Sequence, residues 1–207
     1  MSEFEPIASE IKLELEKRHL VREEVLKKSR ILIQTCSKAI KLIHRRDFDA
    51  ASAMIAEARG YSSEMRNAAA GHPEVLYAGY IQDSEKEMVE AAGLLALVSG
   101  QTYPTPETMG VGLTSYLNGM GEAASEVRRY VLDDMRAGKF AQAEAMMARM
   151  ESVYDELTTF DFPDSVTGGL RRTCDALRAV IERTRSDLTL TALQQELVQE
   201  LRKQSYA

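Results

Sequence analysis

An unbroken helical pattern at the start of the chain is the feature that most constrains the fold. Apolar residues recur at helical spacing from Ile7 to Arg46, and all five prolines of the chain lie outside this segment. About 40 helical residues would extend roughly 60 Å at 1.5 Å per residue. Helices in globular proteins are usually far shorter, so the pattern predicts either one long helix with an exposed end or two joined helices. It also predicts that the chain assembles with other chains.

The remaining sequence carries helical patterns too, and it predicts an all-α fold. Helix-forming residues are abundant, whereas valine, isoleucine and alternating polar and apolar residues are sparse. Asp47 and Gly138 stand where one helix should begin and another should stop. We predict a single domain over residues 1–207 with seven helices, at 7–46, 47–70, 73–98, 113–137, 140–157, 166–185 and 188–203, the last two meeting near Asp187.

Composition and missing motifs exclude several classes of protein. The 207 residues carry a formal net charge of −6, which argues against a globally basic nucleic-acid coat but leaves room for a local basic patch. No apolar stretch is long enough to span a membrane, and the first residues carry no signal-peptide core. Cys36 and Cys174 lie too far apart in sequence to suggest a disulfide framework, so we expect a cytoplasmic protein. The chain has no CxxC, GxxxxGK(S/T), strand-preceded GxGxxG or GxSxG motif, which excludes zinc-ribbon, P-loop, Rossmann and α/β-hydrolase sites.

A local excess of positive charge lies in the second half of the long predicted helix. Residues 27–46 contain seven lysines or arginines and no acid. Five of them, which we call the basic row, share one helix side: Lys27, Arg30, Lys38, Lys41 and Arg45. Such a row fits a phosphate backbone, but a solvated helix face that pairs with acids elsewhere explains the same pattern. No aromatic residue interleaves with it, so a base-stacking platform is not indicated.

Acidic residues form the second cluster. Asp83, Glu87 and Glu90 follow steps of four and three and share one side of a predicted helix. Glu122 and Glu126 are one turn apart on another helix, and two antiparallel helices would bring Glu122 against the first group. Three converging carboxylates suit Mg²⁺ or Mn²⁺. A metal held there would lower the pKa of a bound water and stabilise a phosphoryl oxyanion.

Structural roles explain the same residues. Glu126 can pair with Arg129 or Tyr130, and Glu87 with Lys86 or a neighbouring chain. Acid pairs at helical spacing are also common by chance in helical acidic chains. Gly119 and Gly121 lie beside these acids, where a glycine costs about 1 kcal/mol of helix stability against alanine. Close packing of helices is the expected use of both glycines, and a tight approach to a ligand is the alternative.

Two stretches resemble the signatures of a known family. REEVLKKSRILIQTCSKAIKLIHR, residues 22–45, is similar to the N-terminal signature of the translin superfamily. SYLNGMGEAASEVRRYVLDDMRAGKF, residues 115–140, resembles the second signature, and a final DLTL also fits. Order and spacing agree over nearly the whole chain. The resemblance implies a seven-helix α-bundle whose members form hollow, octamer-like shells and bind single-stranded nucleic acid.

Within this family the chain resembles the catalytic branch, that of translin-associated factor X. The resemblance implies a Mg²⁺-dependent endoribonuclease with a Glu-x-x-Glu pair on one helix, matched here by Glu87 and Glu90. Glu122, six residues after Tyr116, stands where the branch has Asp, and Glu126 matches its next Glu. This exchange moves a carboxylate by roughly an angstrom, and misplacement of that order can cost about 100-fold in rate. The resemblance also implies phosphate contacts on the N-terminal signature, for which the candidates are Arg30, Lys38, His44 and Arg45.

The leading hypothesis is therefore a metal-dependent endoribonuclease acting on single-stranded RNA. Glu87, Glu90 and Glu122 would be the catalytic metal ligands, with Glu126 as a further candidate ligand and Mg²⁺ or Mn²⁺ as the ion. We expect a homo-oligomer in the form of an octamer-like shell, with single-stranded DNA as a second ligand. One alternative, motivated by the Glu122 exchange, is a non-catalytic single-strand-binding oligomer of the translin type. The other is a helical scaffold without nucleic acid, consistent with the net negative charge.

Overall fold

The computed structural model describes residues 3–205, and every regular element in that range is a helix. The helices are α1 (Phe4–His44), α2 (Phe48–Ala69), α3 (Pro73–Leu76), α4 (Gly79–Ser99), α5 (Pro106–Met109), α6 (Leu113–Glu126), α7 (Arg128–Arg136), α8 (Phe140–Thr158), α9 (Asp164–Thr167) and α10 (Leu170–Ser205). The prediction of an all-α fold is confirmed. The long first helix is a single helix of 41 residues rather than two joined ones.

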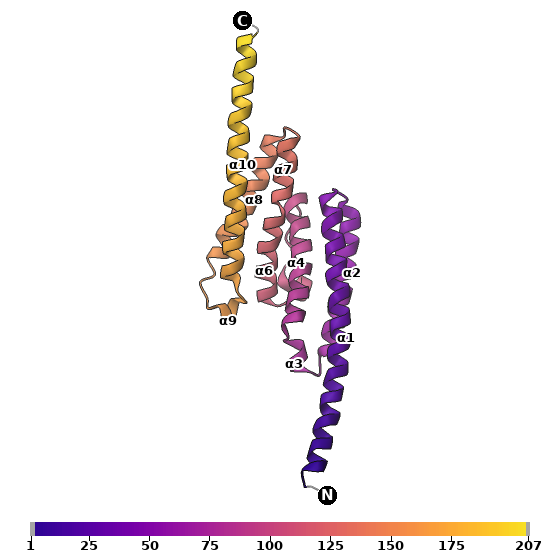
Figure 1. The fold of residues 1–207 in the computed structure, drawn as a ribbon. Coiled ribbons are helices and arrows are strands. Elements are labelled where there is room, and N and C mark those ends of the chain that lie inside the picture. Colours follow the sequence, from indigo (N-terminus) through magenta and orange to yellow (C-terminus); the bar gives the residue numbers. More distant parts are fainter. Residues whose placement is uncertain (1–2, 206–207) are drawn as a thin grey trace.

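Helices α1 and α2 form an antiparallel hairpin along one side of the molecule (Figure 1). Buried residues of both helices alternate steps of four and three, at 25, 29, 32, 36, 39 and 43 in α1, where Thr35 is buried in addition, and at 51, 55, 58, 62, 65 and 69 in α2. This spacing is the heptad pattern that packs helices along a shared seam. Asp47 caps α2 as predicted, because its side chain accepts a hydrogen bond from the backbone N–H of Ala50.

Helices α4 and α6 lie at the centre and run in the same direction, which corrects the predicted antiparallel pair. Ser115, at the start of α6, donates to the carbonyl of Gln82 at the start of α4, and Gly93 faces Met120 and Ala123 further along both helices. The connecting residues 100–112 return the chain to the start of α4. Thirteen residues can span roughly 40 Å when extended, enough to retrace a helix of this length.

Helix α10 is one continuous helix, so the predicted break near Asp187 is wrong. The carboxylate of Asp187 does not cap a new helix. It accepts a hydrogen bond from the guanidinium of Arg128 in α7 at 2.7 Å, and the helical backbone of α10 continues through this residue. Two other predicted helices are divided. Residues 73–98 become α3 and α4, separated at the extended residue Ala78, and residues 113–137 become α6 and α7, separated at Val127. The predicted stop at Gly138 is confirmed by its positive φ of 71°.

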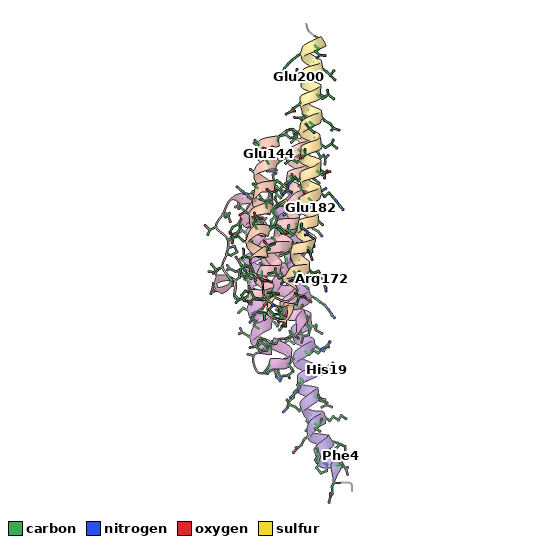
Figure 2. The ribbon with its side chains drawn as sticks, turned by 90° about the vertical axis from the view of Figure 1, so that its left-hand side faces the viewer. Phe4, His19, Glu144, Arg172, Glu182 and Glu200 are labelled. Carbon is green, nitrogen blue, oxygen red and sulfur yellow. The ribbon has the colours of Figure 1, made fainter. Side chains whose placement is uncertain are left out.

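The two long helices project beyond the body at opposite ends of the molecule (Figure 1). Phe4 and His19 lie on the projecting part of α1, and Glu200 lies on that of α10 (Figure 2). Both projections expose large apolar side chains, among them Ile7, Ile11 and Leu15 on α1 and Leu190, Leu193 and Leu197 on α10. No helix of the described chain combines the length and apolar character that crossing a membrane requires.

Candidate metal centre

Three carboxylates meet where α4 and α6 pack together. Glu87 and Glu90 of α4 and Glu122 of α6 each offer one oxygen, and these oxygens all lie within 4.8 Å of one another. All three side chains are half-buried. We call them the carboxylate cluster. Helical spacing alone places the first two on one face, and the parallel packing of α6 supplies the third.

Close contact between the two helices explains the convergence. A Cβ atom added at Gly119 would lie 2.6 Å from the backbone oxygen of Lys86 and 2.6 Å from the Cβ of Val89. One added at Gly121 would lie 2.6 Å from a methyl carbon of Thr173 in α10. Neither position has room for a side chain, so both glycines serve close helix packing, as expected. The carboxylate of Glu122 lies within one turn of this contact and therefore reaches the acids of α4.

The electrostatics of the carboxylate cluster favour a bound cation. Burial, followed by repulsion from the neighbouring carboxylates, raises the pKa of Glu90 to about 8. Burial, followed by the charge of Glu122, also raises the pKa of Glu87 above its ordinary value. A divalent ion would relieve this repulsion, and an all-oxygen ligand set suits a hard cation such as Mg²⁺. The residues present therefore fit the metal that the sequence predicts.

Lys86 already provides one positive charge. Its Nζ lies 2.7 Å from Oε1 of Glu122, and both side chains are about two-thirds buried or more. Burial of the ammonium acts to lower its pKa, but the hydrogen bond and charge of Glu122, together with the charges of Glu87 and Asp83, raise the pKa of Lys86 above its ordinary value. Lys86 is thus an ion-pair partner within this group of acids, as the sequence suggested, but its hydrogen-bonded partner is Glu122 and not Glu87.

Glu126 lies beside the carboxylate cluster but outside it. The Nε2 of His44 in α1 lies 2.8 Å from Oε2 of Glu126, and this hydrogen bond lowers the pKa of that carboxyl. The hydrogen-bond partner of Glu126 is thus His44, and neither Tyr130 nor Arg129, although the charge of Arg129 also acts to lower the pKa of Glu126. The side chain of His44 is only 6% exposed, so the structure does not bring it to the surface shared by the other candidate phosphate contacts. Glu126 instead adds negative charge next to Glu90.

Cys36 of α1 lies beneath the carboxylate cluster. Burial, followed by the charges of Glu87 and Glu90, raises the pKa of this thiol to about 12. A neutral thiol is a poor ligand for Mg²⁺, so Cys36 is a buried neighbour of the carboxylate cluster and not a candidate metal ligand. Cys36 and Cys174 are both buried and unbonded, in agreement with the expectation that they form no disulfide.

Comparison with known proteins supports the resemblance seen in the sequence. No family model matches the chain. The uncharacterized protein MJ0175 of Methanocaldococcus jannaschii is 31% identical over 170 residues, which cover 81% of this chain and 75% of that protein. The structure of AfC3PO in complex with duplex RNA is 33% identical, covers 90% of this chain and 97% of the other, and superposes with a TM-score of 0.81. A crystal structure of AfC3PO is 32% identical over the same shares, with a TM-score of 0.82.

The chain belongs to the translin superfamily. Apo-NeC3PO, at 21% identity and a TM-score of 0.79, shares the same fold over 90% of this chain. The translin-type helical fold that the two sequence signatures implied is therefore confirmed.

The basic row of this translin-family chain lies on a different surface from the carboxylate cluster. All five side chains are exposed, including Arg30, Lys38 and Arg45 among the candidate phosphate contacts. At 100° per residue they lie about 120–200° around α1 from Cys36, whose side faces the carboxylate cluster. Within one chain, helix α1 separates the two features. Any strand that contacts both must pass around α1 or reach from a second chain.

Proposed function

We propose that this chain is a metal-dependent endoribonuclease of the translin superfamily. The observation that carries the proposal is the convergence of Glu87, Glu90 and Glu122, whose oxygens lie within 4.8 Å of one another. A purely structural acidic cluster would gain by exchanging one acid for a neutral residue, because like charges at this distance repel. Raised pKa values and an all-oxygen ligand set are typical of sites that hold a catalytic cation.

The carboxylate cluster and its neighbours would have different roles in hydrolysis. Glu87, Glu90 and Glu122 would hold Mg²⁺ or Mn²⁺, and Glu90 must give up its proton to do so. A divalent ion in this position supplies an acidified water and offsets the charge that develops on the phosphoryl oxygens. His44 keeps Glu126 ionised and fixed, which maintains negative charge beside the ligands. No described feature of the site reads base edges, so little sequence preference is expected.

RNA is the proposed substrate class. The relative AfC3PO, at 33% identity over 90% of this chain, was solved as a complex with duplex RNA. The exposed basic row on α1 offers the positive charge that a phosphate backbone requires. The sequence signatures favour single-stranded RNA as the substrate, whereas AfC3PO was solved with duplex RNA. Both forms of RNA therefore belong in the test.

A cleavage assay tests the proposal. End-labelled single-stranded RNA, duplex RNA and single-stranded DNA are incubated with the protein in Mg²⁺, Mn²⁺ or EDTA. Wild-type protein should cut RNA only with a divalent ion, and Glu90→Gln should lose at least about 100-fold in rate because one ligand carboxylate is gone. Glu144→Gln is the matched control, since Glu144 is an exposed acid of α8 (Figure 2) and is not a member of the carboxylate cluster. Equal cleavage by Glu90→Gln and wild type would refute the nuclease.

A non-catalytic strand-binding protein is the second candidate. The ion pair between Lys86 and Glu122 favours it, because the ammonium competes with a metal for one of the three carboxylates. This function predicts RNA binding that falls with salt, without products in any divalent ion. Failure to bind RNA at all would leave the helical scaffold as the remaining hypothesis.

We also propose that the chain forms a homo-oligomer, with an octamer-like shell as the expected form. Leu190, Leu193 and Leu197 form a stripe on the projecting part of α10, and each is more than half exposed. Apolar stripes of this kind on soluble chains usually cover a partner surface. Light scattering should show a multimer that Leu193→Glu with Leu197→Glu dissociates, whereas Gln195→Glu, about half a turn away, should not. A monomeric wild type would refute this proposal.

A further inference from the structure

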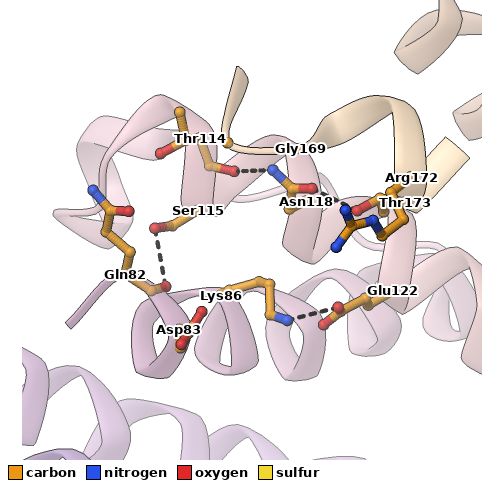
Figure 3. A pocket seen from close by; sticks show the side chains of 11 residues that line it. Gln82, Asp83, Lys86, Thr114, Ser115, Asn118, Glu122, Gly169, Arg172 and Thr173 are labelled. Carbon is orange, nitrogen blue, oxygen red and sulfur yellow. Dashed lines mark hydrogen bonds and ion pairs between the residues drawn. The ribbon is translucent and has the colours of Figure 1, made fainter. Parts of the chain in front are cut away.

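A cleft of about 250 Å³ adjoins the carboxylate cluster (Figure 3). Its walls come from α4, from α6 and from the turn that leads from α9 into α10. Glu122 lines the cleft and also belongs to the carboxylate cluster, so any group bound in the cleft lies next to the proposed metal. Glu87 and Glu90, the other two members of the carboxylate cluster, do not line the cleft.

Two cations line the cleft. Lys86 enters from α4, and its Nζ lies 2.7 Å from Glu122. Arg172 enters from the first turn of α10, and its guanidinium extends into the space above the Lys86–Glu122 pair (Figure 3). Within residues 3–205 the Arg172 side chain has no hydrogen-bond or ion-pair partner. Its planar fork is therefore available to an oxyanion such as a phosphate.

The wall that carries Arg172 is fixed in place. Asn118 of α6 is buried, and its amide nitrogen donates to the backbone oxygens of Thr114 and Thr167. Its amide oxygen accepts from the hydroxyl of Thr173 at 2.5 Å. These bonds join α6 to the end of α9 and the start of α10, and they use both N–H donors of the amide. Asn118 thus ties the wall that carries Arg172 to α6, and Ser115 of α6 in turn donates to the carbonyl of Gln82 in α4, the helix that carries Lys86.

The charges of the cleft depend on the metal. Without an ion, Lys86 and Arg172 face Glu122 and the exposed acid Asp83, so the lining is close to neutral. A divalent ion bound to the carboxylate cluster takes over the neutralisation of Glu122 and frees the ammonium of Lys86. The cleft then carries two cations with no committed partner, which suits one backbone phosphate.

We propose that this cleft is a phosphate subsite for the RNA strand, with Lys86 and Arg172 as its phosphate-binding residues. The inference rests on the proposed function as an RNA-binding enzyme and adds the place where the strand is gripped beside the metal. Lys86 has two states: it pairs with Glu122 in the metal-free protein and with the strand when the metal is bound. Recognition is through the backbone, so it is independent of base sequence.

The test compares Arg172→Gln with Arg171→Gln. Arg171 is the adjacent arginine of α10, is also exposed, and lines a different cleft against α8. Affinity for a single-stranded RNA oligonucleotide is measured over a series of salt concentrations, in Ca²⁺ and in EDTA. In Ca²⁺, Arg172→Gln should bind about five- to tenfold more weakly and reduce the salt slope by about 0.7, the value for one lost single-strand phosphate contact. Arg171→Gln should change affinity by less than about twofold. Equal effects of the two variants would overturn the subsite.

Lys86→Gln tests the two states of the lysine. Removing the ammonium frees Glu122, so affinity for the divalent ion should rise about three- to tenfold while RNA affinity in Ca²⁺ falls. A variant that loses both affinities together would overturn the proposed exchange of Lys86 between Glu122 and the RNA strand.

The nuclease proposal and the subsite proposal can fail separately. A wild type that cleaves RNA while Arg172→Gln behaves like Arg171→Gln keeps the nuclease and rejects the subsite. If the wild type never cleaves RNA but binds it more tightly than Arg172→Gln does, the phosphate subsite is kept and the nuclease is rejected.

Discussion

His44 of α1 and Glu126 of α6 meet across the packed helices, with 2.8 Å between Nε2 of the imidazole and Oε2 of the carboxylate. The His44 side chain is almost fully buried, and its Nδ1 finds no hydrogen-bond partner in the described range. The contact links the long N-terminal helix to the helix that carries Glu122. It also keeps Glu126 ionised next to Glu90, so one buried histidine influences the charge of the proposed metal centre.

Loss of His44 should therefore act on stability before it acts on RNA binding. His44→Leu leaves a half-buried carboxylate without its donor, which should reduce the free energy of unfolding by about 1–3 kcal/mol. His44→Gln can still donate and should recover part of this loss. Urea denaturation measures both variants. If His44→Leu is as stable as wild type but loses RNA affinity as Lys38→Gln does, His44 is a phosphate contact as the sequence suggested.

Metal affinity should depend on pH through Glu90. Its pKa of about 8 means that the carboxyl is largely protonated at neutral pH, and a metal must displace that proton. Apparent affinity for Mn²⁺ should rise about tenfold per pH unit up to about pH 8 and then level off. Titration calorimetry in buffers of different ionisation enthalpy should detect about one proton released per ion below that pH. A flat affinity profile would show that Glu90 is already ionised.

The metal-free protein should gain stability when Glu90 is neutral. The folded-state pKa of Glu90 is raised above the value of about 4.5 expected in the unfolded chain, so this group costs progressively more stability as pH rises from about 4.5 to about 8. In EDTA at about pH 8.5, Glu90→Gln should be about 1–3 kcal/mol more stable than wild type, and near pH 5 the two should be alike. Glu144→Gln should show no such pH-dependent difference. Greater stability of wild type at both pH values would contradict the raised pKa.

The close contact at Gly119 should be intolerant of a side chain. In Gly119→Ala the new Cβ would stand 2.6 Å from the Lys86 backbone, so α4 and α6 must separate. We expect a loss of about 1–3 kcal/mol in unfolding free energy, together with weaker metal binding, because Glu122 moves with its helix. Gly60→Ala is the control. A Cβ at this exposed position of α2 meets no atom within 4 Å, so it should stabilise the helix by about 0.5–1 kcal/mol.

Shortening Glu122 to Asp should reduce RNA cleavage, although the catalytic branch that the sequence resembles has Asp at this position. The carboxylate of Glu122 already lies within 4.8 Å of those of Glu87 and Glu90, and Asp would withdraw it by roughly an angstrom. Glu122→Asp should lower the single-turnover rate of RNA cleavage by about 10- to 100-fold with little change in RNA affinity. A faster Glu122→Asp would mean that the aspartate of the catalytic branch is the better ligand in this chain as well.

Local patterns in the sequence determined the helices and some of their ends. The first helix extends without interruption because no proline breaks its apolar stripe, and Asp47 begins the second because a carboxylate can accept from the first free N–H groups. Glu87 and Glu90 share a face in any α-helix, since three residues nearly complete one turn. These features depend only on neighbours along the chain, and they were predicted correctly.

Contacts between distant segments decided the rest. The direction of α6 relative to α4 follows from the returning segment 100–112 and the contact at Gly119, and neither is expressed in helical periodicity. Asp187 looks like a cap in sequence but pairs with Arg128 across the bundle, so α10 continues. His44 looks like part of a basic surface but is buried against Glu126. A helical repeat specifies which residues share a face, whereas the partner of that face depends on tertiary packing. The sequence therefore identified the three acids as a group, whereas the parallel packing that brings them together, the ion pair of Lys86 with Glu122 and the adjoining cleft depend on the folded chain.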